Sequence, residues 1–444
     1  MLRTLSSNPL RQRILRPACA CAGLSLVLAF ARAEPLHGQI CPNSARLTRS
    51  VEPPLDVVRY LADDALHGRL AGSAGERCAG DYLAWTFEEI GLEPGGDDGT
   101  YFQSLQLESA LNPHLRGGSG RNVVGVLTGA DPERRDDVIV VGAHYDHLGM
   151  GGAGSLAPGE EAIHNGADDN ASGVAALVAV ARTLAEQPRP SRSIVFVAFT
   201  GEEMGLLGSA HFVARGDIPV TRMKAMLNMD MVGRLGDGTL IVYGVDTAAE
   251  WRDLVESAAD SVGVDVALQG SGMGPSDHTS FYAREVPVLH FFTNVHGDYH
   301  KPGDDWEKID GEGLARIARM VGILATHLAS RSEDLVVVRG AGRPAGTPAA
   351  PPTGGYGAYL GSVPDFAPVD HGVLLSGVSP ESPAERAGLT TGDVIVGLGE
   401  HEVADLQGLT DALRAHRPGD TVEVRFIREE QTHRVTVTLG SRNN

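Results

Sequence analysis

The stretch DVIVVGAHYDH, residues 137–147, decides the fold, because an apolar run ends there on an imidazole and a carboxylate. A short run of β-branched residues bounded by glycine and polar residues predicts a buried strand. His144 and Asp146 follow at its end, two positions apart, so an extended backbone turns both side chains to the same side. In open α/β sheets, functional side chains gather beyond the carboxyl ends of the strands. The sequence therefore predicts a site at the end of this strand.

Further motifs bring acidic and imidazole side chains to the same kind of position. They are NGADDNASG (165–173), FTGEE (199–203), NMDMVG (228–233) and DYHKPGDD (298–305). Each has an ordinary structural explanation when taken alone, such as a turn, a helix cap or a surface pair. Taken together they supply imidazole nitrogens and carboxylate oxygens, the donor set that suits zinc. We therefore predict a two-zinc hydrolase site with the metal ligands His144, Asp168, Glu203, Asp230 and His300.

Two carboxylates are expected to assist these ligands. Glu202, next to the ligand Glu203, is predicted to be the general base. Asp146 is expected to accept the second ring N–H of His144 and so to fix its tautomer. Three other histidines in or near these segments, His147, His164 and His290, are predicted to be ordinary buried or surface residues.

Strand and helix patterns alternate along most of the chain, which predicts an α/β layer fold with a largely parallel or mixed sheet. Apolar, β-rich runs are expected to form the strands, and amphipathic runs with stop signals the helices. The strands are predicted at 138–142, 194–199, 225–228, 240–243 and 286–292, and the helices at 74–90, 174–186 and 313–330.

Composition changes divide the chain into four parts. Residues 1–33 begin with arginines, continue with an apolar run and end in Ala-Arg-Ala, the order of a secretory signal peptide. Residues 34–335 hold the α/β pattern, and residues 336–355 are rich in Gly, Pro and Ala, as expected of a linker. Residues 356–444 return to short strands and predict a small β-rich domain. We expect the protein to be exported to the periplasm or the extracellular space, with no membrane span in the mature chain.

Charge and cysteine content limit the partners and the compartment. The net charge of −20, with 42% hydrophobic and 21% charged residues, is that of a globular, acidic protein. Nucleic acid and anionic membranes are therefore not expected as partners. After removal of the signal, Cys41 and Cys78 remain. An oxidising compartment could join them, but the sequence does not show whether they come within reach.

The motifs GAHYDH, GADDNASG, FTGEE, NMD, SDHTSF and YHKPGD resemble, in order and spacing, the di-zinc aminopeptidases of the bacterial leucine aminopeptidase and aminopeptidase S type. The resemblance covers about residues 55–330 and implies a three-layer α/β/α fold with a mixed central sheet. It further implies that His144 and Asp230 hold one zinc, that Glu203 and His300 hold the other, and that Asp168 bridges them.

The same resemblance places a cis peptide between Asp168 and Asp169. It also implies hydrogen bonds from Ser276, Asp277 and His278 to the substrate or to a ligand.

The segment GVLLSGVSPESPAERAGLTTGDVIVGLGEHEV, residues 372–403, resembles a PDZ domain of the bacterial, protease-associated kind. Such domains capture the C-terminus of an extended peptide by strand addition. The resemblance implies that a helix at 405–416 lines the groove and that the carboxylate-binding loop is formed by Tyr359, Leu360, Gly361 and Ser362.

These observations favour an exported zinc aminopeptidase that acts on peptides. A glutaminyl-peptide cyclotransferase and a carboxypeptidase or dipeptidase on the same scaffold remain alternatives, as does a non-catalytic protein that binds peptides through its PDZ domain. The preferred N-terminal residue, the ligand of the PDZ domain and the oligomeric state do not follow from the sequence.

Overall fold

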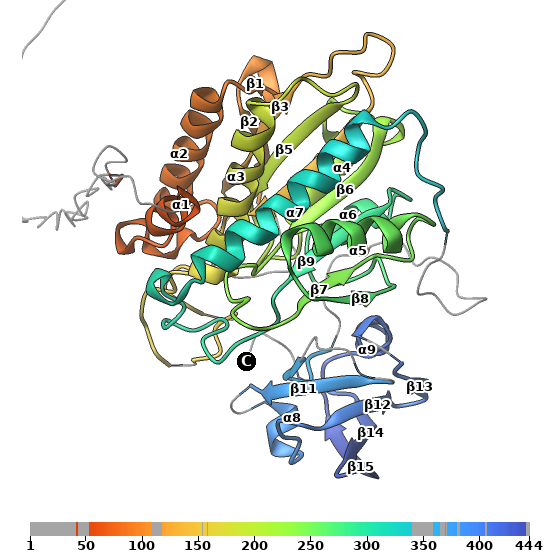
Figure 1. Ribbon diagram of the computed structural model, residues 1–444. Helices are drawn as coiled ribbons and strands as arrows, with labels where there is room; N and C mark the ends of the chain where they lie inside the picture. Colours follow the sequence, from red (N-terminus) through yellow and green to blue (C-terminus); the bar gives the residue numbers. More distant parts are fainter. Residues whose placement is uncertain are drawn as a thin grey trace, which may run out of the picture. The chain divides into compact units, whose positions relative to one another are not determined.

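The computed structural model describes residues 41–42, 53–107, 118–339 and 358–440, apart from 153, 158, 365–368, 370, 380, 381 and 405 (Figure 1). The expected signal peptide, residues 1–33, and most of the expected linker lie outside the described residues. Among the helices that are described, none has the length and apolar character to cross a membrane.

A nine-stranded mixed sheet forms the centre of the large domain. Its strands are β1 (Glu93–Pro94), β2 (Phe102–Gln106), β3 (Ser119–Leu127), β4 (Val138–His144), β5 (Ser193–Phe199), β6 (Met223–Met229), β7 (Leu240–Tyr243), β8 (Val266–Gln269) and β9 (Val288–Phe292). They lie in the order β1-β3-β5-β4-β6-β9-β7-β8, with β2 beside β3. The four central strands β5, β4, β6 and β9 are parallel, whereas β3 and β7 are antiparallel to their inner neighbours.

Side chains of the central strands are buried on both faces of the sheet. In β5, Ile194 and Phe196 belong to one hydrophobic cluster, while Val195 and Val197 belong to another. Because successive side chains of a strand point to opposite faces, the two clusters are the cores above and below the sheet. Burial on both sides explains why the sequence of β5 is apolar throughout.

Helices cover both faces and complete three layers. They are α1 (Pro53–Leu61), α2 (Ala74–Ile90), α3 (Gly173–Ala185), α4 (Leu207–Arg215), α5 (Trp251–Val262), α6 (His278–Tyr282) and α7 (Gly311–Ser330). The larger core includes residues of α1, α2, α3, α5 and α7, of which α3 and α7 cross the sheet face seen in Figure 1. The smaller core includes Phe212 of α4 and Phe281 of α6. The expected three-layer α/β/α fold with a mixed sheet is confirmed.

Helix α2 has the bounds that the sequence predicts, because both of its ends carry strong local signals. The Ser73 side chain accepts a hydrogen bond from the N–H of Glu76, and Gly91 ends the helix with φ 83°, a conformation that glycine adopts without strain. A disulfide joins Cys78 of this helix to Cys41, with 5.4 Å between the Cα atoms. The structure thus decides a pairing that the sequence left open.

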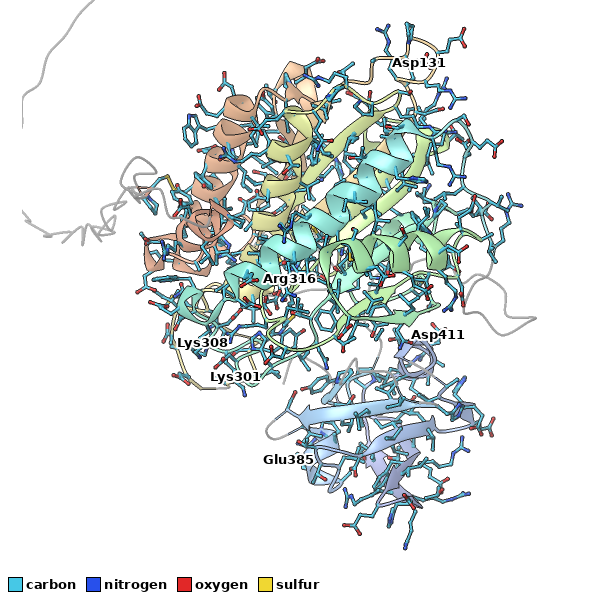
Figure 2. All side chains as sticks on the ribbon, in the orientation of Figure 1. Asp131, Lys301, Lys308, Arg316, Glu385 and Asp411 are labelled. Carbon is cyan, nitrogen blue, oxygen red and sulfur yellow. A yellow bond between two sulfur atoms is a disulfide. The ribbon has the colours of Figure 1, made fainter. Side chains whose placement is uncertain are left out.

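The carboxyl ends of the four parallel strands meet at one edge of the sheet. Figure 2 shows Lys301 and Lys308, from the loop that follows β9, at this edge, while Asp131, from the turn before β4, lies at the opposite one. The motifs at 199–203, 228–233 and 298–305 follow β5, β6 and β9, so they all arrive at the edge where β4 ends. The topology alone therefore brings together residues that are far apart in the sequence.

The C-terminal domain is a smaller, antiparallel β structure with its own hydrophobic core. It consists of β10 (Ser362–Pro364), β11 (Val373–Val378), α8 (Pro383–Arg386), β12 (Val394–Leu398), β13 (His401–Glu402), α9 (Leu406–Arg414), β14 (Thr421–Arg428) and β15 (Gln431–Thr438). Residues 336–338, expected to begin the linker, are still bonded to the large domain, since the N–H of Val338 donates to Thr247 and Val337 bridges to Ala248. The large domain therefore extends to about residue 338.

Candidate metal centre

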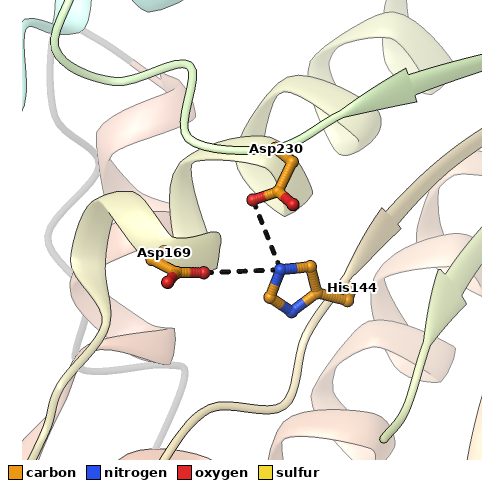
Figure 3. Close-up of side chains that lie close together, drawn as sticks. All are labelled: His144, Asp169 and Asp230. Atoms are coloured by element: carbon orange, nitrogen blue, oxygen red, sulfur yellow. Dashed lines mark hydrogen bonds and ion pairs between the residues drawn. The ribbon is translucent and has the colours of Figure 1, made fainter. Parts of the chain in front are cut away.

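One carboxylate, Asp169, stands between two groups of potential metal ligands. Its Oδ1 lies 3.4 Å from Nε2 of His144, which is in turn 3.3 Å from Oδ1 of Asp230 (Figure 3). Its Oδ2 lies 3.1 Å from Nε2 of His300, which is 3.3 Å from Oε2 of Glu203. The two oxygens of Asp169 thus face two separate donor groups.

These separations fit a zinc ion in each group. Zinc bonds to nitrogen and oxygen ligands are about 2.0 to 2.1 Å long, so two tetrahedral ligand atoms lie about 3.3 Å apart. All four contacts are close to that value. In each group an imidazole and two carboxylates face one another, which is a donor set that zinc accepts. The residues therefore fit two zinc ions bridged by Asp169.

The bridging position was predicted for Asp168, and that prediction is wrong. Oδ1 of Asp168 accepts the N–H of Gly233 at 2.7 Å, and its Oδ2 lies 3.2 Å from Nε2 of His296. Asp168 and Asp169 adjoin each other in a tight turn, so one side chain points to the β6 loop and only the other to the ligands. The cis peptide was also placed one residue too early, because it lies between Asp169 and Asn170.

Two buried charged residues hold this turn in place. Oδ2 of Asp304 accepts the N–H of Asp168 at 2.9 Å and that of Asp169 at 3.0 Å. Arg69, which is only 1% exposed, donates to the carbonyl oxygens of Asn165 and Gly166 before the turn and to that of Tyr145 after β4. The guanidinium thereby ties the end of β4 to the segment that carries Asp169, and its charge offsets that of the surrounding carboxylates.

The rings of His144 and His300 are each oriented by a contact at the second nitrogen. Nδ1 of His300 donates to the carbonyl of Gly154 at 2.8 Å, which leaves Nε2 as the free acceptor that a metal requires. Nδ1 of His144 lies 3.2 Å from the carbonyl oxygen of Asp146. The expected partner was the Asp146 carboxylate, but that group is more distant, at 3.8 Å, and accepts the N–H of Glu202 instead.

His147, predicted to be an ordinary histidine, lies at the centre as well. Its Nδ1 is 2.7 Å from Oε1 of Glu203 and 4.0 Å from Asp169, and the group of His147, Asp169 and Glu203 is compact enough to hold a metal ion. A separation of 2.7 Å is that of a hydrogen bond and is shorter than the spacing of two zinc ligands. We therefore assign His147 to holding the Glu203 carboxylate and His300 to the metal.

The adjacent glutamates have opposite electrostatic environments. Burial raises the pKa of Glu202 well above its ordinary range. Burial also works to raise the pKa of Glu203, but the imidazoles of His300 and His147 outweigh it and lower that pKa to about 2. Neighbouring carboxyl groups with pKa values driven apart are suited to different roles. Glu203 is the better ligand, and Glu202 the better carrier of a proton.

Of the SDH segment, only Ser276 bonds to a ligand. Its hydroxyl donates to Oδ2 of Asp230 at 2.7 Å. Asp277 is fully buried below the centre, and burial raises its pKa to about 7. The ring of His278 stacks on that of His290, 4.3 Å between centroids. None of these three residues lines the pocket, so the structure gives no substrate contact for them.

A pocket opens beside the candidate ligands, and its wall is partly apolar. Besides the candidate ligands and Glu202, the residues that line the pocket are Met231, Tyr243, Pro275, His290, Phe292, Val295 and Tyr299. The space between these residues, which is open to solvent, is about 450 Å³.

The residues expected to bind a peptide carboxylate in the C-terminal domain lie before and at the start of β10. The carbonyl oxygens of Leu360 and Gly361 accept the N–H groups of Ala384 and Ser379. Gly361 has φ 83°, and a Cβ there would lie 2.1 Å from that of Ser382, so only glycine fits. Tyr359 pairs with Gly440, and Ser362 is the first residue of β10. The helix predicted at 405–416 is α9, Leu406–Arg414.

Two parts of the chain match models of known protein families. Residues 122–325 match the model of peptidase family M28, and residues 360–439 match that of the PDZ domain. Aminopeptidase YwaD of Bacillus subtilis is 29% identical over 229 residues, which are 49% of this chain and 46% of that protein. The match therefore spans less than half the length of that relative.

Two solved structures have the same fold as the large domain. A zinc aminopeptidase from Bacillus subtilis has a TM-score of 0.52 and 19% identity, covering 65% of this chain and 98% of the other. Porphyromonas gingivalis glutaminyl cyclase has a TM-score of 0.51 and 21% identity, covering 62% of this chain and 97% of the other. At these identities the structures establish the fold alone.

The role of Asp304 leads to a first prediction. Replacing it by Asn removes the charge that holds the two N–H groups of the turn and bonds to Arg234 at 3.2 Å. Loss of a residue that orients a metal ligand typically lowers affinity by 10- to 100-fold. We expect Asp304→Asn to weaken zinc binding by about that factor in competition with a fluorescent chelator. Asp298→Asn is the matched control, since Asp298 also contacts Arg234 but no N–H of the turn. Equal zinc affinities of the two variants would contradict this role.

Proposed function

Residues 122–325 belong to peptidase family M28 and residues 360–439 to the PDZ domains, and from this premise we propose that the chain is an exported zinc aminopeptidase with two metal ions and a glutamate base. The observation that supports it most is Asp169, whose two carboxylate oxygens face separate donor groups inside a pocket. In this proposal His144 and Asp230 hold one zinc, Glu203 and His300 hold the other, and Asp169 binds both.

The metal ligands and Glu202 have different chemical roles in this proposal. Zinc in these positions would make a water molecule more acidic and would polarise the carbonyl of the scissile bond. Glu202 lines the pocket, with its Oε2 at 3.9 Å from Nε2 of His144, and its N–H is fixed by the Asp146 carboxylate. From there Glu202 takes the proton of the attacking water and delivers it to the leaving amine.

The charges around the pocket favour an amino-terminal over a carboxyl-terminal substrate. Four carboxylates line it, and no lysine or arginine does among the residues that the structure describes. A C-terminal carboxylate would find no basic side chain in this lining to pair with. This observation supports an aminopeptidase over the carboxypeptidase alternative.

A glutaminyl cyclase is the nearest rival, because it shares the fold. The cyclases resemble a one-zinc variant of the scaffold, and only one of the two donor groups would then be needed. Here both groups have their full set of ligands, and the second is supported by His147 and Gly154. The same completeness argues against a protein that only binds peptides.

Export is supported by two independent features. Residues 1–33 have the order of a signal peptide, and Cys41 and Cys78 form a disulfide, a bond that persists in oxidising compartments.

For the C-terminal domain, we propose capture of the C-terminus of an extended peptide. Strand β10 is at the end of the sheet order and pairs only with β11 among the described strands, so its other edge can accept a further strand. The loop of Tyr359, Leu360, Gly361 and Ser362 leads into this strand and is placed to receive the carboxylate.

Hydrolysis of aminoacyl p-nitroanilides tests the proposed activity. We expect release of p-nitroaniline that stops on removal of metal by a chelator and returns when two equivalents of zinc are added. Substrates with a blocked α-amine are the control and should not react. Conversion of an N-terminal glutamine to the cyclic product, with no cleavage of any anilide, would identify a cyclase instead.

Glu202→Gln tests the general base. The variant keeps the size of the side chain but loses the proton acceptor, so kcat should fall by several orders of magnitude while zinc content stays at the wild-type level. Glu256→Gln, an exposed position on α5, is the matched control and should turn over normally. Unchanged turnover of Glu202→Gln would remove Glu202 from the mechanism.

Peptide titration tests the PDZ proposal. We expect the full chain with Glu202→Gln, which does not degrade its ligand, to bind members of a fluorescent decapeptide library that end in a free carboxylate. Amidation of the same C-terminus removes the charge and should weaken binding by at least about tenfold. Equal affinity of the two forms, measured by anisotropy, would exclude carboxylate capture.

A further inference from the structure

His290 lies in the wall of the pocket without being part of the metal centre. It occupies the middle of β9 and is nearly fully buried, beside Tyr243 and Phe292. A side chain held next to the scissile bond must enter this pocket, because the metal ligands line the same space. His290 therefore lies where the first side chain of a peptide substrate would be held.

A chain of hydrogen bonds determines which nitrogen of His290 carries the proton. The Asp230 carboxylate only accepts, so the Ser276 hydroxyl donates to it and offers its lone pairs to Nδ2 of Asn228, 2.8 Å away. The same Nδ2 lies 3.1 Å from Nδ1 of His290. Because an amide nitrogen only donates, Nδ1 of His290 must be the acceptor. The proton of the neutral ring is then on Nε2.

Nε2 of His290 has no hydrogen-bond partner within the described part of the chain. Both ring nitrogens of His278, whose ring stacks on that of His290, are buried away from solvent without a hydrogen-bond partner. Nε2 of His290 is not sealed from solvent in this way. Burial lowers the pKa of His290 to about 4, so the ring is neutral at neutral pH. The pocket therefore contains a neutral N–H donor in a wall that also includes the apolar side chains of Met231, Phe292 and Val295.

We propose that His290 is a specificity-determining residue that selects peptides whose first side chain carries a neutral hydrogen-bond acceptor on an apolar stem. Glutamine is the residue of that shape, with its side-chain carbonyl accepting from Nε2. An apolar side chain would bury the N–H without a partner, which costs more than the hydrogen bond itself contributes. A carboxylate would lack a lysine or arginine among the lining residues. The inference rests on the proposed aminopeptidase function.

Paired substrates test this role within each protein variant. Glutaminyl and norleucyl p-nitroanilides have side chains of similar length and differ in the acceptor, and the glutamyl compound adds the charge. For the wild type, kcat/KM should be highest for glutamine. His290→Phe keeps a flat ring and removes the donor, so the ratio of glutamine to norleucine should fall about tenfold. A ratio is independent of how much of each variant is folded.

Two further variants separate hydrogen bonding from the shape of the pocket. His290→Gln retains an N–H donor at a similar distance from the backbone and should restore part of the ratio. Val295→Ala changes another part of the wall without a polar atom, and its ratio should stay near that of the wild type. Binding of Gln-Ala and norleucyl-Ala to zinc-loaded Glu202→Gln protein, with and without His290→Phe, gives the same comparison by calorimetry without turnover.

The outcomes distinguish the role of His290 from the proposed aminopeptidase function. Cleavage of all anilides with a ratio that His290→Phe leaves unchanged would overturn the role of His290 and keep the aminopeptidase. A wild-type preference for norleucine over glutamine would do the same. Cleavage of no anilide by the zinc-loaded protein would overturn the proposed function and the inference with it.

Discussion

The structure depends on one electrostatic constraint, the burial of several carboxylates within a few ångströms of one another. Asp169, Glu203 and Asp230 lie together at the centre, with Glu202 and Asp146 beside them, and all are largely removed from water. Each buried carboxylate costs several kcal/mol unless a cation or several donors compensate it. Imidazoles and the guanidinium of Arg69 supply part of this compensation, and divalent ions would supply the rest. Without a bound cation, the folded site therefore has too little positive charge to compensate its carboxylates.

The parallel sheet makes such a concentration of charge possible. The apolar cores hold strands β4, β5, β6 and β9 in position. Their carboxyl ends are therefore fixed, whatever the direction of the side chains that follow them. Hydrogen bonds around the candidate ligands then determine the directions of these side chains. Asp304 holds the turn, Gly154 and Asp146 orient the imidazoles, and Ser276 bonds to Asp230. The packing energy of the sheet thus offsets the electrostatic repulsion among the buried carboxylates.

The sequence predicted the elements better than the directions of single side chains. Helix α2 could be placed to the residue because Ser73 and Gly91 mark its ends. Apolar runs predicted β4, β5, β6, β7 and β9, whereas β1, β2, β3 and β8 were not predicted. Asp168 and Asp169 could not be told apart, since both occupy the same turn and only its tertiary bonds to Asp304 and Gly233 decide which one faces inward. His147 and Arg69 were missed because their partners are distant in the sequence. A local pattern gives no information about such contacts.

The chain of bonds from Asp230 through Ser276 and Asn228 to His290 has a consequence for how such a site can change. Asp230 needs Ser276 as a donor, and this one requirement fixes the amide of Asn228 and then the tautomer of His290. The polarity of the pocket wall is thus determined by a candidate metal ligand through the side chains of Ser276, Asn228 and His290. A substitution of Asn228 would therefore alter the pocket wall and the support of Asp230 at once. Residue 290 itself can vary more freely, because it is the last member of the chain and nothing among the described residues depends on its Nε2.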